Sequence, residues 1–354
     1  MKIIQLLPTL INGDGIGNDT IAIDKIIKEL GYKTKIYAEY IGPGIPKSIA
    51  NRINKMPVLH EKDILIYHLS VGTTLNDQLQ GLKCRKLIVY HNVTPPDFFN
   101  GYSQTSMNSC IEGIRDVQKL SNVADYCWAV SEYNRQELIG YGYKCNIDVI
   151  PIVVPFEDYD KKPKQIIIDK YQDEYVNIVF VGRVVPNKKH EDIIKTFYYY
   201  KKYINSKSRL FLVGSFNGME RYYERLNKYV TELELNDVHF TGHIKFNELL
   251  SYYHLADVFL CMSEHEGFCI PLLEAMHFEI PIIAYADTGV KDTLRGVGLG
   301  MEEKNCKVAA ELIDQLVVKE DFRKNIVNMQ NERLKDFYYE KTRSKIEACL
   351  KGFI

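Results

Sequence analysis

Short apolar runs alternate with longer amphipathic stretches along the chain. In the first half, strands are expected in KIIQLL, KTKIYA, DILIYH, KLIVYH, YCWAVS and NIDVIP. Helical patterns lie between most of them, such as DTIAIDKIIKELG, where apolar residues recur at about 3.6-residue spacing and Gly31 marks the stop. The rhythm restarts at residue 176 with VNIVFVG, RLFLVG, DVHFTG, DVFLCM and PIIAYA. Apolar strands alternating with helices are typical of parallel sheets covered by helices on both faces.

Two such series predict an α/β protein with two Rossmann-like, doubly wound parallel-sheet domains that face a cleft. The length of 354 residues also favours two domains. A charged stretch beginning near Pro155 separates the series, and after about residue 303 the pattern is helical throughout. We expect an N-terminal domain, a linker, a C-terminal domain and a final helix that packs back on the N-terminal domain, over 1–155, 156–174, 175–335 and 336–354 respectively.

Composition excludes several classes of protein. The net charge is −1, from 45 basic and 46 acidic residues, so no overall positive field favours nucleic acid. No run of 18 apolar residues is present, which excludes a spanning helix, and Pro8 breaks the first apolar run before it reaches signal-peptide length. The eight cysteines lack CxxC spacing and several lie in apolar segments, as expected of reduced thiols in a cytoplasmic protein.

Ligands of open α/β sheets bind beyond the carboxyl ends of the strands. After VNIVFVG, Arg183 leaves the strand end directly, and Lys188 follows near the start of a helix expected at about 189–204. Two cations beside a helix N-terminus suit a polyanion such as a pyrophosphate, because the backbone amides and the helix dipole add to the attraction. The alternative is a solvated basic loop.

A second turn with candidate ligand-binding residues lies in SEHEGFCIPLLEAM, from residue 263 to residue 276. Pro271 suits the first helical position, and the residues before it include no Ser, Thr, Asp or Asn cap. The early amides of this helix therefore need another partner, and an external anion is a good one. Gly267 allows the backbone to approach a ligand closely. We expect the backbone amides of Phe268, Cys269 and Ile270 to face the anion.

Glu266 and Glu274 stand at the two ends of this turn. A carboxylate should not face a phosphate, so both side chains are expected to accept from neutral donors beside it. Sugar hydroxyls fit this requirement, with a ribose diol on one side and a transferred hexose on the other. The alternatives are a solvated loop charge for Glu266 and, for Glu274, a glutamate that interacts with the helix dipole, worth ~0.3–1 kcal/mol.

These segments carry a resemblance to a known family. GRVVPNKKHEDII and EHEGFCIPLLEAM, in this order and about 80 residues apart, resemble the nucleotide-sugar site of the retaining glycosyltransferases of family four, which have the GT-B fold. The second segment is similar to that family's E-x7-E motif. The intervening LFLVGS and VHFTGHI also occur in the expected order.

The resemblance implies a role for each matching residue. Arg183 and Lys188 would hold the donor pyrophosphate, Glu266 would contact the transferred sugar, and Glu274 would contact the ribose. The loop after the third strand of the second series would meet the base mostly through its backbone, at Gly242, His243 and Ile244. Cys269 is a departure, because glycine is more usual there; its amide remains available to a phosphate.

The first domain offers three further candidates. The segment NGDGIGND (12–19) does not match the dinucleotide-binding pattern G-x-G-x-x-G, and no acidic residue other than Glu39 lies near the end of the second strand. The resemblance places the tip of this loop toward the donor phosphate or the acceptor, at Gly13, Asp14 and Gly15. His91 ends a strand where similar enzymes have a histidine beside the transferred sugar and acceptor. Ser131 is a weaker candidate of the same kind.

Front-face transfer with retention needs little general-base chemistry from the protein, because the leaving phosphate oxygen can itself accept the proton. Arg183, Lys188 and the helix amides would stabilise its charge, so we expect neither a metal nor a cofactor. A D-x-D tripeptide at residues 158–160 lies in the charged linker and is not expected to bind metal. The basic, tyrosine-rich stretch at 197–207 is more typical of a helix packing face, and peripheral contact with the inner face of a membrane is the alternative.

The sequence therefore predicts a retaining, metal-independent hexosyltransferase. The donor would be a nucleoside-diphosphate sugar of the GDP-mannose or UDP-glucose type, and the acceptor a glycan or lipid-linked saccharide in polysaccharide biosynthesis. Two alternatives stay open at this stage. One is another GT-B-like enzyme, such as a nucleotide-sugar epimerase or a phosphorylase, and the other is a non-catalytic nucleotide-sugar-binding module. Closure of the two domains on the donor is also expected.

Overall fold

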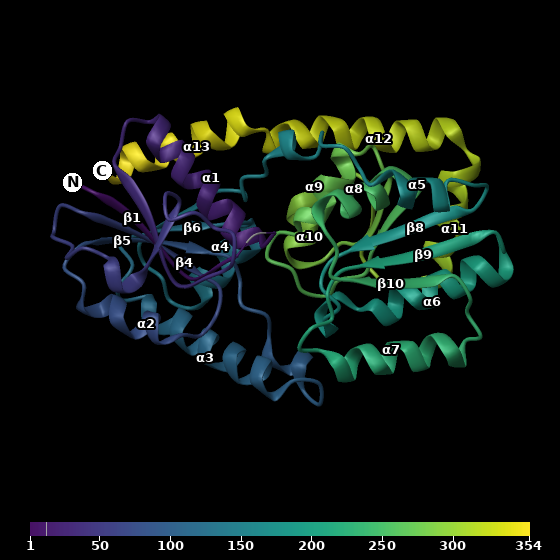
Figure 1. Ribbon diagram of the computed structural model, residues 1–354, viewed down its shortest axis with the longest axis horizontal. Coiled ribbons are helices and arrows are strands. Elements are labelled where there is room, and N and C mark those ends of the chain that lie inside the picture. Colours follow the sequence, from purple (N-terminus) through teal and green to yellow (C-terminus); the bar gives the residue numbers. More distant parts are fainter. Residues whose placement is uncertain (12) are drawn as a thin grey trace. The chain divides into compact units, whose positions relative to one another are not determined.

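The computed structural model describes residues 1–11 and 13–354 and divides into two compact units (Figure 1). The first unit contains Met1–Pro96, Thr105–Pro155 and Asp336–Ile354. The second unit contains Asp97–Gln104 and Phe156–Lys335. The last nineteen residues thus belong with the first unit, while 97–104, which the sequence places in the N-terminal domain, belongs with the second.

The first unit is built on a seven-stranded sheet in the order β3-β2-β1-β4-β5-β6-β7. All its strand pairs are parallel. The strands are β1 (Ile3–Leu10), β2 (Thr34–Ile41), β3 (Ala50–Arg52), β4 (Ile64–Leu69), β5 (Arg85–Tyr90), β6 (Tyr126–Ala129) and β7 (Asn146–Val149). Their apolar side chains are buried on both faces, as parallel strands require.

Each face of this sheet has its own helices (Figure 1). The helices α1 (Gly15–Glu29) and α13 (Tyr339–Phe353) cover one face, where Ile26 and Leu350 join a core with Ile64 and Trp128. The other face carries α2 (Thr74–Gln78), α3 (Gln104–Leu120) and α4 (Glu132–Gly140). Alternate residues of one strand therefore point toward different helices.

The second unit has a six-stranded parallel sheet in the order β10-β9-β8-β11-β12-β13. The strands are β8 (Val176–Val181), β9 (Ser208–Val213), β10 (Val238–Gly242), β11 (Val258–Cys261), β12 (Ile282–Tyr285) and β13 (Leu299–Met301). Its helices are α5 (Gln165–Tyr171), α6 (His190–Tyr203), α7 (Glu220–Glu232), α8 (Phe246–Leu255), α9 (Ile270–His277), α10 (Thr288–Leu294), α11 (Cys306–Val318) and α12 (Glu320–Leu334).

The predicted fold class is confirmed, because each unit is a parallel sheet with helices on its faces and the chain after β13 is helical. The stretch 156–174, expected as a linker, instead contains the short 3-10 helix Phe156–Asp158 and α5, which packs against α8. Tyr159 within it is buried. These residues are therefore an integral part of the second unit.

The structure bears on two expectations from the sequence, which concern membrane-spanning helices and the state of the cysteines. Among the described residues, none of the helices combines the length and apolar character that crossing a bilayer demands. All eight cysteines are free thiols, and several are buried, which agrees with reduced core residues. The sulfur atoms of Cys127 and Cys145 lie 3.6 Å apart, beyond the length of a disulfide bond.

Candidate functional site

The loop after β8 presents the predicted cations. Gly182 ends the strand with φ 157°, Arg183 follows with an exposed side chain, and Lys188 lies in the 3-10 turn Pro186–Lys188. Lys189 then adopts a left-handed conformation, and α6 begins at the next residue without a side-chain cap. A Cβ atom at Gly182 would lie 3.1 Å from Cδ of Lys188, so this glycine leaves room for the lysine to pass over the strand end.

The loop after β11 ends at an uncapped helix, as predicted. Cys269 is the residue before α9, and no side chain caps the first turn, which contains Pro271. Cys269 has φ 73°, a left-handed conformation that costs roughly 1–2 kcal/mol for a residue with a Cβ atom. This conformation explains why glycine suits the position better, and the cysteine here is nevertheless buried.

The two loops meet through an ion pair between Lys188 and Glu266. Nζ of Lys188 lies 2.5 Å from Oε1 of Glu266, and both side chains are largely buried. Burial lowers the pKa of Lys188, but the charge and hydrogen bond of Glu266 outweigh it, so the net shift of that pKa is upward. The lysine is therefore a fixed positive charge at the carboxyl end of the sheet.

Asn187 holds the two loops together beside this ion pair. Its side-chain amide nitrogen donates to the backbone oxygen of His265 over 2.9 Å, and the backbone oxygen of Asn187 accepts from the backbone N–H of Glu264 over 2.8 Å. Lys304 adds a second link, because its Nζ lies 2.8 Å from Glu264 and 2.7 Å from Asp192 on α6. The sequence analysis did not single out these residues.

Glu274 has different partners from the pair above. Its Oε1 accepts from the hydroxyl of Tyr159 over 2.5 Å, and its Oε2 accepts from the hydroxyl of Tyr253 on α8. The carboxylate is buried, which raises its pKa, while the two tyrosine hydrogen bonds lower that pKa and leave a net upward shift. The side chain expected at a ribose is thus held by two phenol groups, neither of which the sequence analysis proposed.

The other second-unit candidates differ in exposure, and Phe268 among them is buried. Gly242 ends β10 with φ 68°, His243 is exposed and Ile244 is half-buried. Gly267 and Phe268 occupy the turn before α9, and the backbone oxygen of Phe268 accepts from the hydroxyl of Thr293. Within the described chain, no ion pair or hydrogen bond of the Arg183 side chain is found, so this guanidinium is available to a ligand.

In the first unit, the predicted loop starts α1. Asp14 is the N-cap residue and its carboxylate accepts from the backbone N–H of Gly17 over 3.1 Å; Gly15 is the first helical residue. Gly13 has φ 79°, which glycine adopts without strain. Asn12, the first residue of the predicted segment, lies outside the described residues. The aspartate expected at the donor or acceptor therefore already serves as a helix cap.

His91 and Ser131 follow β5 and β6. His91 is buried, and its Nε2 lies 3.0 Å from Nδ1 of His68 and 4.0 Å from a carboxylate oxygen of Asp19. Burial lowers the pKa of His91 to about 3. The hydroxyl of Ser131 accepts from the backbone N–H of Asn134 over 3.1 Å and caps α4, a structural role that by itself accounts for a serine there.

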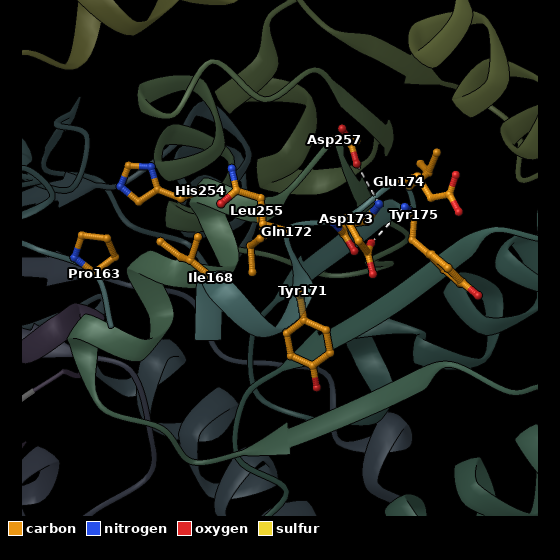
Figure 2. A pocket seen from close by; sticks show the side chains of 12 residues that line it. Pro163, Ile168, Tyr171, Gln172, Asp173, Glu174, Tyr175, His254, Leu255 and Asp257 are labelled. Atoms are coloured by element: carbon orange, nitrogen blue, oxygen red, sulfur yellow. Dashed lines mark hydrogen bonds between the residues drawn. The ribbon is translucent and has the colours of Figure 1, made fainter. Parts of the chain in front are cut away.

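Two other features of the second unit do not form part of this site. In the D-x-D tripeptide, Asp158 pairs with Lys161 at 2.6 Å and Asp160 is exposed, while the tyrosine between them is buried. A separate cavity of about 570 Å³ opens at the amino ends of β8 and β11 (Figure 2). Asp257 in its wall accepts from the backbone N–H of Asn177 over 2.8 Å, so this carboxylate serves the fold.

Solved structures with the same architecture include a protein in complex with UDP-glucose. HepE from Anabaena in complex with UDP-glucose aligns with a TM-score of 0.78 over 99% of this chain and 100% of that one, at 17% identity. Sucrose-phosphate synthase from Thermosynechococcus elongatus aligns with a TM-score of 0.76 over 100% and 99%, at 16% identity. At such identities the likeness defines the fold, and the chain is a two-domain protein of the GT-B class.

The second unit resembles a known family. Residues 161–333, just under half of the chain, match the model of the glycosyl transferases group 1. The matched segment includes both loops described above, from Arg183 to Glu274.

Curated relatives agree with this resemblance. The capsular polysaccharide biosynthesis glycosyltransferase CapM of Staphylococcus aureus is 24% identical over 212 residues, which are 58% of this chain and 52% of that protein. A GDP-mannose-dependent alpha-(1-6)-phosphatidylinositol monomannoside mannosyltransferase of Mycobacterium tuberculosis is 23% identical over 219 residues, or 58% and 56%. The matches thus span about half the length of these relatives.

Proposed function

We propose that this protein transfers a hexose from a nucleoside-diphosphate sugar to a saccharide acceptor, with retention of configuration and without a metal. The observation that carries the proposal is the ion pair of Lys188 and Glu266 at the carboxyl ends of β8 and β11, next to the uncapped start of α9. This edge of a parallel sheet is where α/β proteins bind ligands. The pair therefore brings together the ammonium group of Lys188, which suits a phosphate, and the carboxylate of Glu266, which suits sugar hydroxyls.

The chemistry assigned to this site is a direct exchange at the anomeric carbon. The bond from that carbon to the leaving phosphate oxygen breaks, and a bond to an acceptor oxygen forms on the same face. The acceptor proton passes to the departing phosphate oxygen, so no protein base is needed. Lys188, Arg183 and the backbone amides at the start of α9 stabilise the growing negative charge, and loss of one such donor typically costs ~10²–10³ in rate.

The remaining residues are proposed to position the donor. Glu266 accepts from hydroxyls of the transferred sugar, Glu274 from the ribose, and the backbone at 242–244 contacts the base. The backbone amides of residues 267–270 face the diphosphate. In the first unit, His91 and the loop at 13–15 serve the sugar and acceptor side, with Ser131 as a lesser candidate. Each carboxylate oxygen of Glu274 retains a lone pair beyond its hydrogen bond with a tyrosine. Either oxygen can therefore still accept a hydrogen bond from a ribose hydroxyl.

The proposed donor carries a hexose of the mannose or glucose type. A relative in the matched region is named as GDP-mannose-dependent, and HepE was solved with UDP-glucose, so the two nucleotides are equal first choices. A glycan or lipid-linked saccharide is proposed as acceptor, since one relative is named for capsular polysaccharide biosynthesis. Cytoplasmic location with peripheral membrane contact is part of the same proposal.

A non-catalytic nucleotide-sugar-binding module and an epimerase of the same fold are the competing functions. The binding module would bind a donor without turnover, and an epimerase would convert the donor with no acceptor present. Transfer is favoured over both, because the matched family model and the curated relatives are those of glycosyltransferases.

Thermal unfolding with a panel of UDP, GDP, ADP, CMP, dTDP and NAD tests the proposal. A diphosphate at a hundred times its dissociation constant should stabilise the protein by ~2.7 kcal/mol. Arg183→Ala and Glu274→Ala should weaken this effect, while Lys324→Ala, which removes an exposed lysine of α12, should not. Sugar transfer to saccharide acceptors in the presence of EDTA then tests catalysis and metal independence. Stabilisation by NAD alone, or by none of the panel, would refute the donor assignment.

A further inference from the structure

A chain of buried polar side chains crosses the first unit beneath His91. Gln5 on β1 and His68 on β4 lie within strands that are otherwise apolar, and both are fully buried. Nε2 of His68 lies 3.0 Å from Oε1 of Gln5, and Nδ1 of His68 lies 3.0 Å from Nε2 of His91. The side chains of Gln5 on β1, His68 on β4 and His91, directly after β5, thus form one continuous hydrogen-bonded series.

The direction of these hydrogen bonds is fixed at the glutamine. The amide nitrogen of Gln5 donates to the backbone oxygen of Thr20 over 3.1 Å. A carbonyl oxygen can only accept, so the amide cannot be turned over, and Oε1 of Gln5 must face His68 as an acceptor. Nε2 of His68 therefore carries the hydrogen and Nδ1 is bare.

The same reasoning then fixes the protonation of His91. The bare Nδ1 of His68 must accept, so Nε2 of His91 carries its hydrogen and Nδ1 of His91 is left as a lone pair. Burial lowers the pKa of both histidines, which keeps each ring neutral with a single N–H. The carboxyl group of Asp19 on α1, whose pKa burial raises to about 7, lies 4.0 Å from Nε2 of His91.

Nδ1 of His91 is a buried acceptor without a partner among the described residues. A buried polar atom left without a hydrogen bond costs roughly 1–3 kcal/mol, so native proteins rarely leave one unless a ligand or water supplies the missing group. A bare ring nitrogen requires a donor such as a hydroxyl, whereas a phosphate oxygen would be rejected.

We propose that Gln5 and His68 are positioning residues that set the ring tautomer of His91 and thereby present Nδ1 as an acceptor to a hydroxyl of the bound sugar. This assignment rests on the proposed function for its ligand, but its protonation pattern stands independently. Gln5 and His68 act on substrate only through His91, whose ring they hold in one orientation and one tautomer.

Metal binding is the competing explanation of the same atoms, since one ligand atom each from Asp19, His68 and His91 lie within 4.8 Å of one another. An ion between them would bind the lone pair of Nε2 in His91 and place the hydrogen on Nδ1. The two explanations therefore predict opposite protonation of one ring. Nitrogen NMR of the full chain labelled in histidine, with the His91 signals assigned from His91→Gln, distinguishes them.

We expect Nε2 of His91 to be protonated and Nδ1 bare in the free protein, and Gln5→Met to give a mixture of tautomers. A matched control is Gln330→Met, which removes a buried glutamine that bonds only to backbone groups of the second unit. A protonated Nδ1 in the wild type would overturn the proposal. Signals that change on addition of EDTA and return with Zn²⁺ would replace it with a metal site.

Kinetics provide the functional test, with UDP-glucose and GDP-mannose as donors. Loss of one hydrogen bond to the sugar should lower kcat/KM by about tenfold. We expect this loss for His68→Leu and Gln5→Met, a smaller loss for His68→Asn, whose Oδ1 replaces the acceptor Nδ1, and none for Gln330→Met. Losses no larger than in the control overturn the functional role. A correct tautomer in a protein without transfer activity would refute the proposed function and leave the tautomer assignment standing.

Discussion

The hydroxyl of Tyr159 donates to Oε1 of Glu274 over 2.5 Å, across 115 positions of sequence. The tyrosine comes from the segment expected as a linker, and the glutamate from a helix expected at the donor. With Tyr253 on the other oxygen, the carboxylate is held in a single orientation within the second unit. Hydrogen bonds to a charged group are among the stronger ones, at about 1.5–3 kcal/mol each.

Tyr159→Phe should therefore lower the free energy of unfolding by about 2 kcal/mol, because Oε1 of Glu274 loses its donor in a buried place. Urea unfolding of the full chain measures the change. If Glu274 contacts ribose, the same variant should also alter nucleotide affinity. The control Tyr203→Phe changes an exposed tyrosine of α6 and should leave both quantities unchanged. Equal unfolding curves for Tyr159→Phe and the wild type would show that the hydrogen bond contributes no stability.

The ion pair of Lys188 and Glu266 should show strong energetic coupling. Removal of one partner from a buried ion pair typically costs about 3–5 kcal/mol, because the other charge is left unpaired. Lys188→Met alone should approach the lower end of this range, and Lys188→Met with Glu266→Gln should cost less than the sum of the single changes. A double-mutant cycle of urea unfolding measures the coupling. Additive effects would contradict an intimate pair.

His190 predicts a dependence of stability on pH. Its ring is fully buried, neither nitrogen has a partner among the described residues, and burial, with the charge of Lys188, lowers its pKa from 6.5 to about 3. Between these values the unfolded chain binds more protons than the folded one, so stability falls as the pH falls.

His190→Met removes this contribution. The free energy of unfolding of the variant, relative to the wild type, should rise by about 2 kcal/mol between pH 7 and pH 5. Urea unfolding at several pH values tests it, and the histidines of the first unit, common to both proteins, cancel in the difference. A difference that does not vary with pH would mean that folding leaves the pKa of His190 unchanged.

The last helix should stabilise the first unit specifically. Leu350 on α13 is fully buried in the core with Ile64 and Trp128, and Leu→Ala changes in cores cost about 2–5 kcal/mol. Leu350→Ala should therefore raise hydrogen exchange in β4 and β6 before it affects β8 and β11. Uniformly faster exchange in both units would indicate that they unfold together.

The apolar pattern predicted the two sheets because most strands are continuous buried runs. It missed β3 and β13, three-residue strands without an apolar run, since their place depends on a neighbouring strand. The segment 156–174 was predicted as a linker because charges dominate it locally. Tyr159 is nevertheless buried, because it packs on aromatic rings from Phe246 and Phe278, which lie far along the chain.

The candidate site, like the fold, could be predicted only in part from local sequence patterns. Lys188 and Glu266 could be found because each follows the carboxyl end of a buried strand, where the fold brings loops together. Gln5 and His68 were passed over, although a polar residue inside an apolar strand is itself a signal. What no local pattern contains is their mutual orientation, which depends on the register of β1, β4 and β5.

The placement of residues 336–354 in the first unit has a consequence for biosynthesis. A ribosome delivers β1 first, yet α13, which covers that sheet beside α1, is delivered only after the entire second unit. Domains generally fold as they emerge, from the N-terminus onward. Here the unit that is translated first is completed last. Its apolar face around Ile64 and Trp128 therefore lacks the cover of α13 on the nascent chain until that helix has been translated.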